Sequence, residues 1–262
     1  MIELRRDGER VLRIGHRGAA TLAPENTLDS FRAAIDVGVD LIEFDVLDLR
    51  AGPLILAHSD HLDEVSHGAV RGRVRGRSLE ALREIAPNLP TFDEALAFFV
   101  DEAPDTGLHV DLKLKTRLDE VAAAIMRHGL EDRTVISGLH VPSLRAVARA
   151  APRVRIGITY PEDRFSISRK PYLWPIVSLG LASMRASVPL RLPRLAQRAG
   201  ATAVMLEHRL VTEASVTRAH AAGLPVLTWT VDEPADLERV IAAGADGVIT
   251  NDPRIFLATL NA

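Results

Sequence analysis

The feature that most constrains this chain is a regular alternation between short apolar runs and longer segments of helical periodicity. The short runs have the length and the Val, Ile and Leu content that are typical of buried strands. Eight runs take part in the alternation, at 11–15, 41–46, 108–113, 134–138, 154–159, 202–206, 226–230 and 247–250. This pattern predicts an α/β fold in which a parallel sheet closes into a (β/α)8 TIM barrel.

Helical patterns separate most of these runs. Asn26 or Thr27 can cap a first helix, and Gly38 is a residue of the kind that ends one. Further helical patterns lie at 118–127, 141–150, 211–221 and 234–243. Because one such barrel takes roughly 250 residues, we expect a single barrel domain over residues 1–262.

The apolar run at 54–57 does not fit the alternation. It follows Val46 after a short stretch that contains Gly52 and Pro53, whereas a parallel crossover needs a dozen or more residues. We therefore predict that this run returns beside the second strand as a hairpin, which brings His58 back to the end of that strand. Residues 47–107 would then form one long insertion after strand 2, including a helix near 92–100.

A second irregular region is expected at about 160–195. It contains an apolar run at 171–184 that is too short to span a bilayer. One interpretation is a core or capping helix. The other is a lipid-facing lid or interfacial helix with Tyr172 and Trp174 as anchors.

The composition excludes several classes of site and partner. Cysteine is absent, which rules out disulfides, thiolate metal sites and cysteine nucleophiles. A formal charge of −3 gives no basic footprint for nucleic acid. The charged N-terminal sequence lacks the apolar core of a signal peptide. We expect a cytoplasmic protein without a nucleic-acid partner; a peripheral membrane contact stays open, and the oligomeric state is not predicted.

Candidate catalytic residues should lie at the carboxyl ends of the strands, where (β/α)8 barrels have their active sites. Glu43 and Asp45 are two residues apart, so their side chains share one face of the second strand. Two buried carboxylates repel each other unless a cation lies between them, and ligation by oxygen alone suits Mg²⁺ or Ca²⁺. Asp111 and Lys113 repeat the spacing on the third strand and add a carboxylate and a cation.

The same residues also allow a structural interpretation, in which Glu43, Asp45, Arg17 and Lys113 form only a salt-bridge network. However, His16 and Arg17 fall at the same predicted face of the barrel. A histidine there offers a proton carrier, and an arginine offers a cation shaped for phosphate. This coincidence favours a catalytic site.

Two further patterns each have two interpretations. Arginines alternate from Arg71 to Arg77 within the insertion, either as a solvated loop or as a patch that attracts anionic head groups. Residues 244–250 form a tight loop and the last strand, in a part of the barrel that often binds phosphate.

Several motifs together resemble the glycerophosphodiester phosphodiesterase family. They are IGHRG, APENTLDSF, the EFD of the second strand, LILAHSD, LPTFDEAL, VDLKLK, LTWTVDEP and GADGVITNDP. The resemblance covers nearly the whole chain and is weakest at 160–200. It implies a divalent-metal-dependent hydrolase that cleaves glycerophosphodiesters to sn-glycerol 3-phosphate and an alcohol.

The resemblance also implies roles for individual residues. His16 and His58 would be the acid/base pair, Glu43, Asp45 and Asp111 would hold one divalent metal ion, and Arg17 and Lys113 would bind the phosphate. Trp229 is a candidate to pack against the glycerol carbons, or a plain core residue. Two positions depart from the family pattern: Ser59 stands where the family usually has Asp, with Asp60 one residue further along, and Asp111 stands where it usually has Glu.

Three other functions stay open. The apolar run at 171–184 could shelter an acyl chain, which would suit a lysophospholipase D acting on lysophospholipids. Lys113 could be the nucleophile of a Schiff-base barrel, which requires a neutral lysine; the nearby Asp111 argues against it. The third is a degenerate barrel that binds phosphate without turnover.

Overall fold

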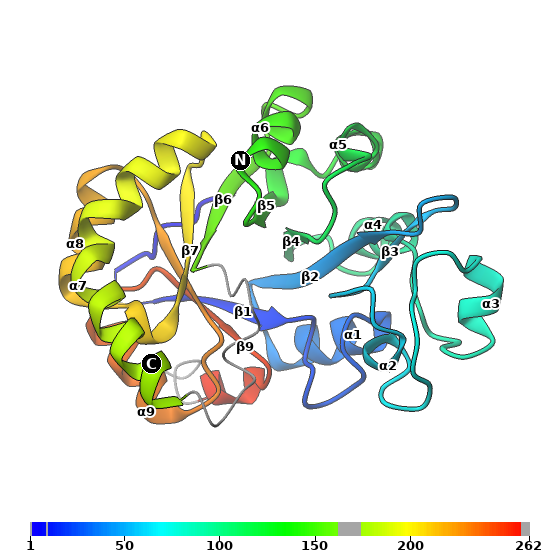
Figure 1. Cartoon of the computed structure of the whole chain (residues 1–262), viewed down its shortest axis with the longest axis horizontal. Helices are drawn as coiled ribbons and strands as arrows, with labels where there is room; N and C mark the ends of the chain where they lie inside the picture. Colours follow the sequence, from blue (N-terminus) through cyan, green and yellow to red (C-terminus); the bar gives the residue numbers. More distant parts are fainter. Residues whose placement is uncertain (1, 9, 162–173, 258–262) are drawn as a thin grey trace.

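The computed structural model describes residues 2–8, 10–161 and 174–257 (Figure 1). Within these residues, eight parallel strands close into a barrel, because β1 pairs with both β2 and β9. The order around the barrel is β1, β9, β8, β7, β6, β5, β4 and β2. The strands are β1 Leu12–His16, β2 Leu41–Asp48, β4 Gly107–Leu112, β5 Thr134–Gly138, β6 Arg155–Tyr160, β7 Ala203–Glu207, β8 Val226–Trp229 and β9 Gly247–Thr250. The (β/α)8 TIM barrel that the sequence predicts is confirmed.

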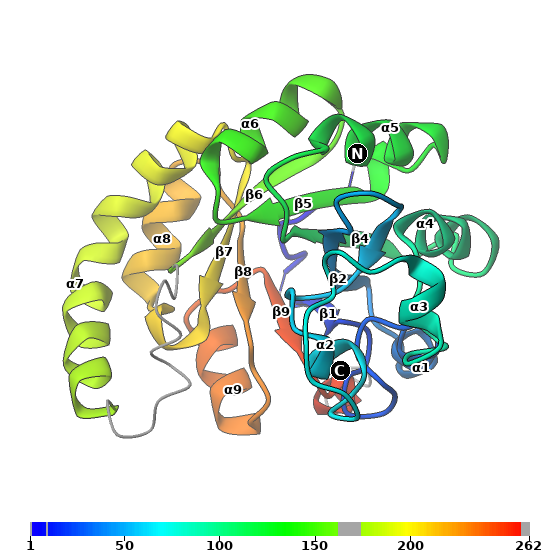
Figure 2. The same cartoon turned by 45° about the vertical axis from the view of Figure 1, so that its right-hand side comes forward.

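Helices form the outer layer around the strands, as Figures 1 and 2 show. They are α1 Leu28–Val37, α4 Phe92–Asp101, α5 Leu118–Arg127, α6 Val141–Ala150, α7 Trp174–Ala199, α8 Glu213–Ala221 and α9 Pro234–Ala242. Short 3-10 turns lie at Glu131–Arg133, His208–Leu210 and Pro253–Phe256. Of the two candidate caps for the first helix, the structure selects Thr27, whose hydroxyl accepts from Ser30 N. Gly38 ends this helix in the left-handed conformation that glycine adopts without strain.

The strand residues that point outward pack against this helical layer. Phe44 of β2 contacts Phe31 of α1 and Phe99 of α4, with ring centroids 5.3 and 5.7 Å apart. All three rings are fully buried. The aromatic residues of this otherwise aliphatic protein therefore concentrate where α1 and α4 meet the barrel.

The strand residues that point inward divide the barrel interior into two levels. The lower level is apolar and includes Ile14, Leu41 and Leu227. The upper level is polar. In the strand register, His16 of β1 lies beside Glu43 of β2, and Glu43 lies beside His109 of β4. Two residues further along β2 and β4, Asp45 lies beside Asp111. Polar groups thus occupy the carboxyl end of the barrel, above an apolar floor.

The predicted hairpin is confirmed. Strand β3, Leu54–Leu56, runs antiparallel to the end of β2, with Val46 opposite Leu56. Two short helices follow it, α2 Leu62–Val65 and α3 Leu79–Arg83. They pack on a small core of their own, which is formed by Leu47, Leu49, Ile55, Ala57, Leu62, Val74, Leu82, Ala86 and Leu89. The predicted insertion over 47–107 is too long, because β2 extends to Asp48 and α4, Phe92–Asp101, belongs to the outer helical layer of the barrel.

The expectation of an irregular region over 160–195 is wrong from Trp174 onward, where α7 runs to Ala199. Pro189 and Pro193 lie inside this helix, and proline inside a helical pattern normally predicts a break. Residues 162–173 lie outside the described part of the chain, and so do the side chains of 174–183. The two interpretations of 171–184 therefore stay predictions. In the described part of the chain, no helix has both the length and the apolarity needed to cross a membrane.

Candidate active site

A cavity of about 440 Å³ opens at the carboxyl end of the barrel. Eight residues that the sequence singles out line it together: His16, Arg17, Glu43, Asp45, His58, Asp111, Lys113 and Trp229. They come from β1, β2, β4 and β8, from the residues that directly follow β1 and β4, and from the segment after β3. The rule that barrel sites lie at strand ends thus identified side chains that the fold brings to one place.

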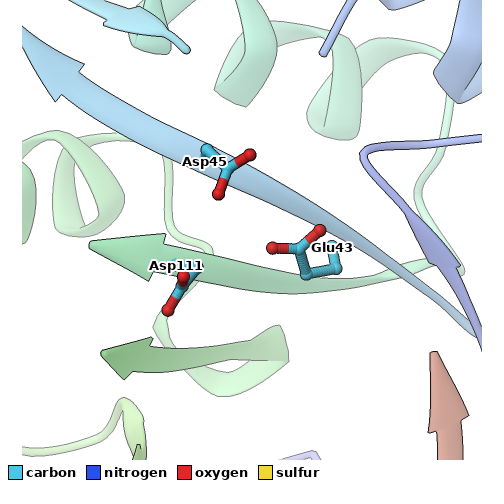
Figure 3. A group of neighbouring side chains, drawn as sticks. All are labelled: Glu43, Asp45 and Asp111. Atoms are coloured by element: carbon cyan, nitrogen blue, oxygen red, sulfur yellow. The ribbon is translucent and has the colours of Figure 1, made fainter. Parts of the chain in front are cut away.

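Three carboxylates form the most acidic part of the cavity. Figure 3 shows Glu43 and Asp45 on β2 and Asp111 on the neighbouring strand β4. One oxygen from each lies within 4.8 Å of the others. Glu43 and Asp45 are buried, and Asp111 is partly buried. A single small cation could contact all three.

Asp45 is held in place by two cations and one amide. Its Oδ1 is 3.1 Å from Lys113 Nζ, and its Oδ2 is 3.0 Å from Arg17 Nε. Asn26 donates to the same Oδ2 at 2.9 Å and accepts from Asp45 N at 3.1 Å. Burial alone would raise the pKa of Asp45, but the charges of Lys113 and Arg17 outweigh it and hold that pKa below its usual range. Asp45 is therefore ionised.

Glu43 is in the opposite situation. Burial raises its pKa well above the usual range, and the charges of Asp45 and Asp111 raise it further. Lys113 and Arg17 only partly offset this effect. When all three carboxylates are ionised, they exceed the two cations, Arg17 and Lys113, by one negative charge; without a further cation, Glu43 holds a proton instead. The all-oxygen donor set and the charge of the ionised cluster fit a hard divalent cation such as Mg²⁺ or Ca²⁺.

Lys113 is held as an ammonium ion. Its Nζ forms ion pairs with both Asp111 and Asp45. Burial alone would lower the pKa of Lys113, but these two carboxylates raise it above its usual range. A Schiff-base mechanism needs the neutral amine, so the surroundings of Lys113 oppose that alternative.

The imidazole of His16 is fixed through Nδ1. This atom lies 2.6 Å from Asn251 Oδ1, and Asn251 in turn donates from Nδ2 to Asp232 Oδ2 at 2.7 Å. The second contact orients the amide, so its oxygen faces the ring and Nδ1 carries the proton. Nε2 faces the cavity, 3.8 Å from Glu43 Oε2. Burial, helped by the charge of Arg17, lowers the pKa of His16 to about 4, so the ring is neutral at pH 7.

His58 lies across the cavity, on the segment that the hairpin returns. Its Nδ1 is 3.3 Å from Glu64 Oε2, and Ser59 Oγ donates to the same oxygen at 2.6 Å. Asp60 is engaged elsewhere, because its Oδ1 accepts from Arg75 N at 2.6 Å. The carboxylate beside the histidine is thus Glu64, six residues along the chain.

Several polar residues of the site escaped the sequence analysis. His109 and Ser137 are buried beside Asp111: His109 Nε2 is 2.8 Å from Ser137 Oγ, which donates to Asp111 Oδ1 at 2.7 Å. The alternation of strand faces could have indicated both residues. Asn251 directly follows β9, so the strand-end rule could have indicated it as well. Glu64 has no such signal, because only the fold of the insertion brings it to His58.

The structure also defines the contacts of the remaining candidates, which are the arginines of 71–77, the loop before β9 and Trp229. Arg75 donates from Nη2 to Asp48 Oδ1 at 2.6 Å, whereas Arg73 has a largely exposed side chain. In the loop before β9, Asp246 is buried and accepts from Val226 N at 2.7 Å, which is a structural contact. The Nε1 of Trp229 is buried without a hydrogen-bond partner among the described residues.

These features define a class of protein: a (β/α)8 barrel enzyme with an acidic cluster, two cations and two imidazoles in one cavity. Comparison with known proteins specifies the class further. The model of the glycerophosphoryl diester phosphodiesterase family matches residues 16–255. The chain belongs to this family, whose members are phosphoric diester hydrolases.

Individual relatives agree with this assignment. A glycerophosphodiester phosphodiesterase of Caldanaerobacter subterraneus subsp. tengcongensis is 27% identical over 95% of this chain and 97% of its own. A protein of Silicibacter pomeroyi, assigned as a glycerophosphoryl diester phosphodiesterase, has a structure with a TM-score of 0.77 and 25% identity, covering 98% of this chain and 96% of that one. A phosphodiesterase of Oleispira antarctica, solved with sn-glycerol-3-phosphate, shares the fold with a TM-score of 0.73 at 18% identity, covering 96% and 98%.

Proposed function

We propose that this protein is a metal-dependent phosphodiesterase that hydrolyses glycerophosphodiesters to sn-glycerol 3-phosphate and an alcohol. The observation that carries the proposal is one cavity in which a cluster of three carboxylates and two cations lies between two imidazoles. Membership of the glycerophosphoryl diester phosphodiesterase family supports it. So does the Oleispira antarctica relative of the same fold, which holds sn-glycerol-3-phosphate.

Glu43, Asp45 and Asp111 are the proposed metal ligands. A divalent ion bound there would act as a Lewis acid on the phosphoryl oxygens. The pKa of Glu43 is raised by burial and by its acidic neighbours, which means that its ionised form is unfavourable there. A bound cation would stabilise this ionised form. Asn26 keeps Asp45 in a fixed orientation by its two hydrogen bonds.

Arg17 and Lys113 are the proposed phosphate-binding groups. Both remain charged, because buried carboxylates keep their pKa values above the usual range. A phosphodiester resists attack because its own negative charge repels nucleophiles. Fixed cations in the cavity offset that repulsion and stabilise the additional charge that develops on the phosphoryl oxygens.

His16 and His58 are the proposed acid and base. Each ring is fixed at Nδ1 by an acceptor, Asn251 for His16 and Glu64 for His58. Nε2 is then the atom left for proton transfer. One ring would take the proton of the nucleophile and the other would protonate the leaving alcohol. Trp229 lines the cavity and is proposed to pack against the glycerol carbons.

A lysophospholipase D activity on lipid substrates is the second candidate. The observation that favours it is Leu139, which lines the cavity and is 43% exposed. An acyl chain could cover this side chain. A peripheral membrane contact through 171–184 and through Arg71 to Arg77 belongs to the same proposal. Detergent-dispersed lysophospholipid should then be a better substrate than a water-soluble diester.

Product analysis with a panel of glycerophosphodiesters tests the proposed function. The protein is incubated with divalent metal and each diester, and sn-glycerol 3-phosphate and the free alcohol are quantified. We expect the two products in equal amounts. Phosphate-ligand binding without release of alcohol, at every divalent metal concentration, would instead identify a degenerate binding barrel.

A further inference from the structure

A carboxylate outside the metal cluster contacts one of the two candidate imidazoles. Glu64 Oε2 lies 3.3 Å from His58 Nδ1 and accepts a hydrogen bond of 2.6 Å from Ser59 Oγ. We propose that Glu64 is a positioning residue, which fixes the His58 ring for proton transfer while Ser59 holds the carboxylate in place. The inference rests on the proposed function, because it assigns Glu64 a part in the reaction through His58.

Two other carboxylates lie close to His58 in the sequence. Asp60 is two residues from His58, but it accepts from Arg75 N at 2.6 Å and pairs with Arg73 at 3.5 Å. Asp63 precedes Glu64 on α2 and is exposed. Of these three carboxylates, Glu64 is the one in contact with the ring.

The segment that carries Glu64 is firmly anchored. Leu62 of α2 is fully buried, and its N donates to Gly72 O at 3.0 Å. Val74, also fully buried, donates from N to Asp60 O at 3.2 Å. These contacts join α2 to residues 71–77, the arginine-containing loop. The position of Glu64 is therefore fixed by this loop as well as by the short helix α2.

The local surroundings make the contact stronger than a surface ion pair. The side chains of His58 and Glu64 are 26% and 19% exposed. A charge-assisted hydrogen bond in such partly dry surroundings resists competition from water better than an exposed one does. The pair also separates the catalytic cavity from a second cavity of about 190 Å³, since both residues line both. A test substitution must therefore conserve the volume of Glu64.

The contact sets the tautomer as well as the orientation of His58. A carboxylate only accepts hydrogen bonds, so a neutral ring facing it carries its proton on Nδ1 and leaves Nε2 as a lone pair. With Nδ1 held in this way, Nε2 is the atom that exchanges a proton, whether His58 acts as the acid or as the base.

The test compares Glu64→Gln with Asp63→Asn. Both remove one negative charge from α2, and only the first removes the charge that faces His58. We expect Glu64→Gln to lower kcat roughly 10- to 100-fold, the size typical of losing a group that orients a reactive side chain. KM and Tm should stay near wild type, and Asp63→Asn should match wild type in all three. Equal kcat values for the two variants would overturn the proposal.

A double-mutant cycle shows whether Glu64 acts through His58. A nitrophenyl phosphodiester, whose leaving group departs easily, keeps the residual rate of His58→Ala measurable. If the two residues act as a unit, adding Glu64→Gln to His58→Ala lowers the rate no further. The same fold loss in both backgrounds would contradict positioning and indicate a separate role.

A spectroscopic readout separates this inference from the proposed function. In ¹⁵N NMR of the neutral ring, wild-type His58 should appear as the Nδ1-protonated tautomer. Glu64→Leu, which has a similar size but no acceptor atom, should shift it toward the mixture found in free histidine. An unchanged His58 spectrum in Glu64→Leu overturns the proposal. A wild-type protein that cleaves no diester but shows this shift would refute the proposed function and leave the contact standing.

Discussion

At the scale of single residues, the two candidate imidazoles share a cavity but have different supports. An amide oxygen fixes His16, and a carboxylate lies against His58. Both keep Nε2 available, and both belong to residues that the sequence motifs already indicate. The supports themselves, Asn251 and Glu64, were not predicted. Asn251 lies 235 residues along the chain from His16, at the end of another strand, and Glu64 reaches His58 only through the fold of the insertion.

The first prediction concerns the imidazoles themselves. Replacing either His16 or His58 with Ala should lower kcat by a factor of about 10² to 10⁴, which is the usual contribution of a positioned acid or base. Circular dichroism should show an intact fold, and a divalent cation should bind as before. Wild-type turnover in either variant would remove that histidine from the mechanism.

A second prediction concerns His109, which lies fully buried beside Ser137. Burial lowers the pKa of His109 to about 4. The unfolded chain therefore binds more protons at this residue between about pH 6.5 and pH 4, so its contribution to stability is complete above that range and is lost as the pH falls through it. For a shift of this size the loss is about 3 kcal/mol.

Urea unfolding from pH 7 to pH 4, in the presence of chelator, measures this contribution. His109→Gln keeps a donor for Ser137 but cannot titrate, so its free energy of unfolding should fall less with acid than that of wild type. His61→Gln, at an exposed position, is the matched control and should follow wild type. Parallel curves for wild type and His109→Gln would contradict the prediction.

At the scale of elements, the hairpin is a feature that the length of the connecting chain predicts. The distance along the chain between β2 and β3 is too short for a crossover, and this alone predicted the antiparallel pairing and the return of His58. The helical state of α7 could not be predicted in the same way. Its two prolines normally break a helix, and only packing in the folded barrel favours the helix over that local tendency.

The arginine-containing loop gives the third prediction. Among its arginines, Arg75 pairs with buried Asp48 and also donates to Lys113 O at 3.4 Å. Arg75→Gln leaves the Asp48 carboxylate without its charged partner, which should cost about 1–3 kcal/mol of stability. Because this loop anchors α2, kcat should fall as well.

Arg71→Gln provides the control, because Arg71 lies exposed in the same loop. It should change neither the free energy of unfolding nor turnover. If Arg75→Gln and Arg71→Gln behave alike in denaturant unfolding and in turnover, the anchoring role of Arg75 is excluded. A loss of vesicle binding in Arg71→Gln alone would instead support the membrane contact proposed for this loop.

At the scale of the whole molecule, barrel closure and the aromatic layer act together. The pairing of β1 with β2 and β9 closes the sheet, and the phenylalanines of β2, α1 and α4 fill the space outside it. The polar end of the barrel needs this rigid support, since charged groups are held close together there. That the chain forms a single domain over 1–262 stays a prediction.

The fourth prediction follows from this aromatic layer. Phe99 of α4 is fully buried against Phe31, Phe44 and Phe98. Phe99→Ala should lower the free energy of unfolding by about 3–5 kcal/mol, because it removes apolar contacts and leaves a cavity. Val100→Ala, at a position that is 45% exposed, should change it by less than about 0.5 kcal/mol. Equal effects in denaturant unfolding would show that this layer does not stabilise the barrel.

The proposed function depends on a divalent metal ion bound by the acidic cluster. The measurement that tests it is the rate of sn-glycerol 3-phosphate release by metal-stripped protein as Mg²⁺ or Ca²⁺ is added back. Glu43→Gln is the informative variant, because the raised pKa of Glu43 means that a neutral amide should fold well there.

For wild type we predict no release in chelator and a saturable rise that reaches its limit at one bound ion per chain. Glu43→Gln should show little rise at the same metal concentrations while keeping the wild-type Tm in chelator. A full wild-type rate in excess chelator, or an equal response of Glu43→Gln to metal, would contradict the claim.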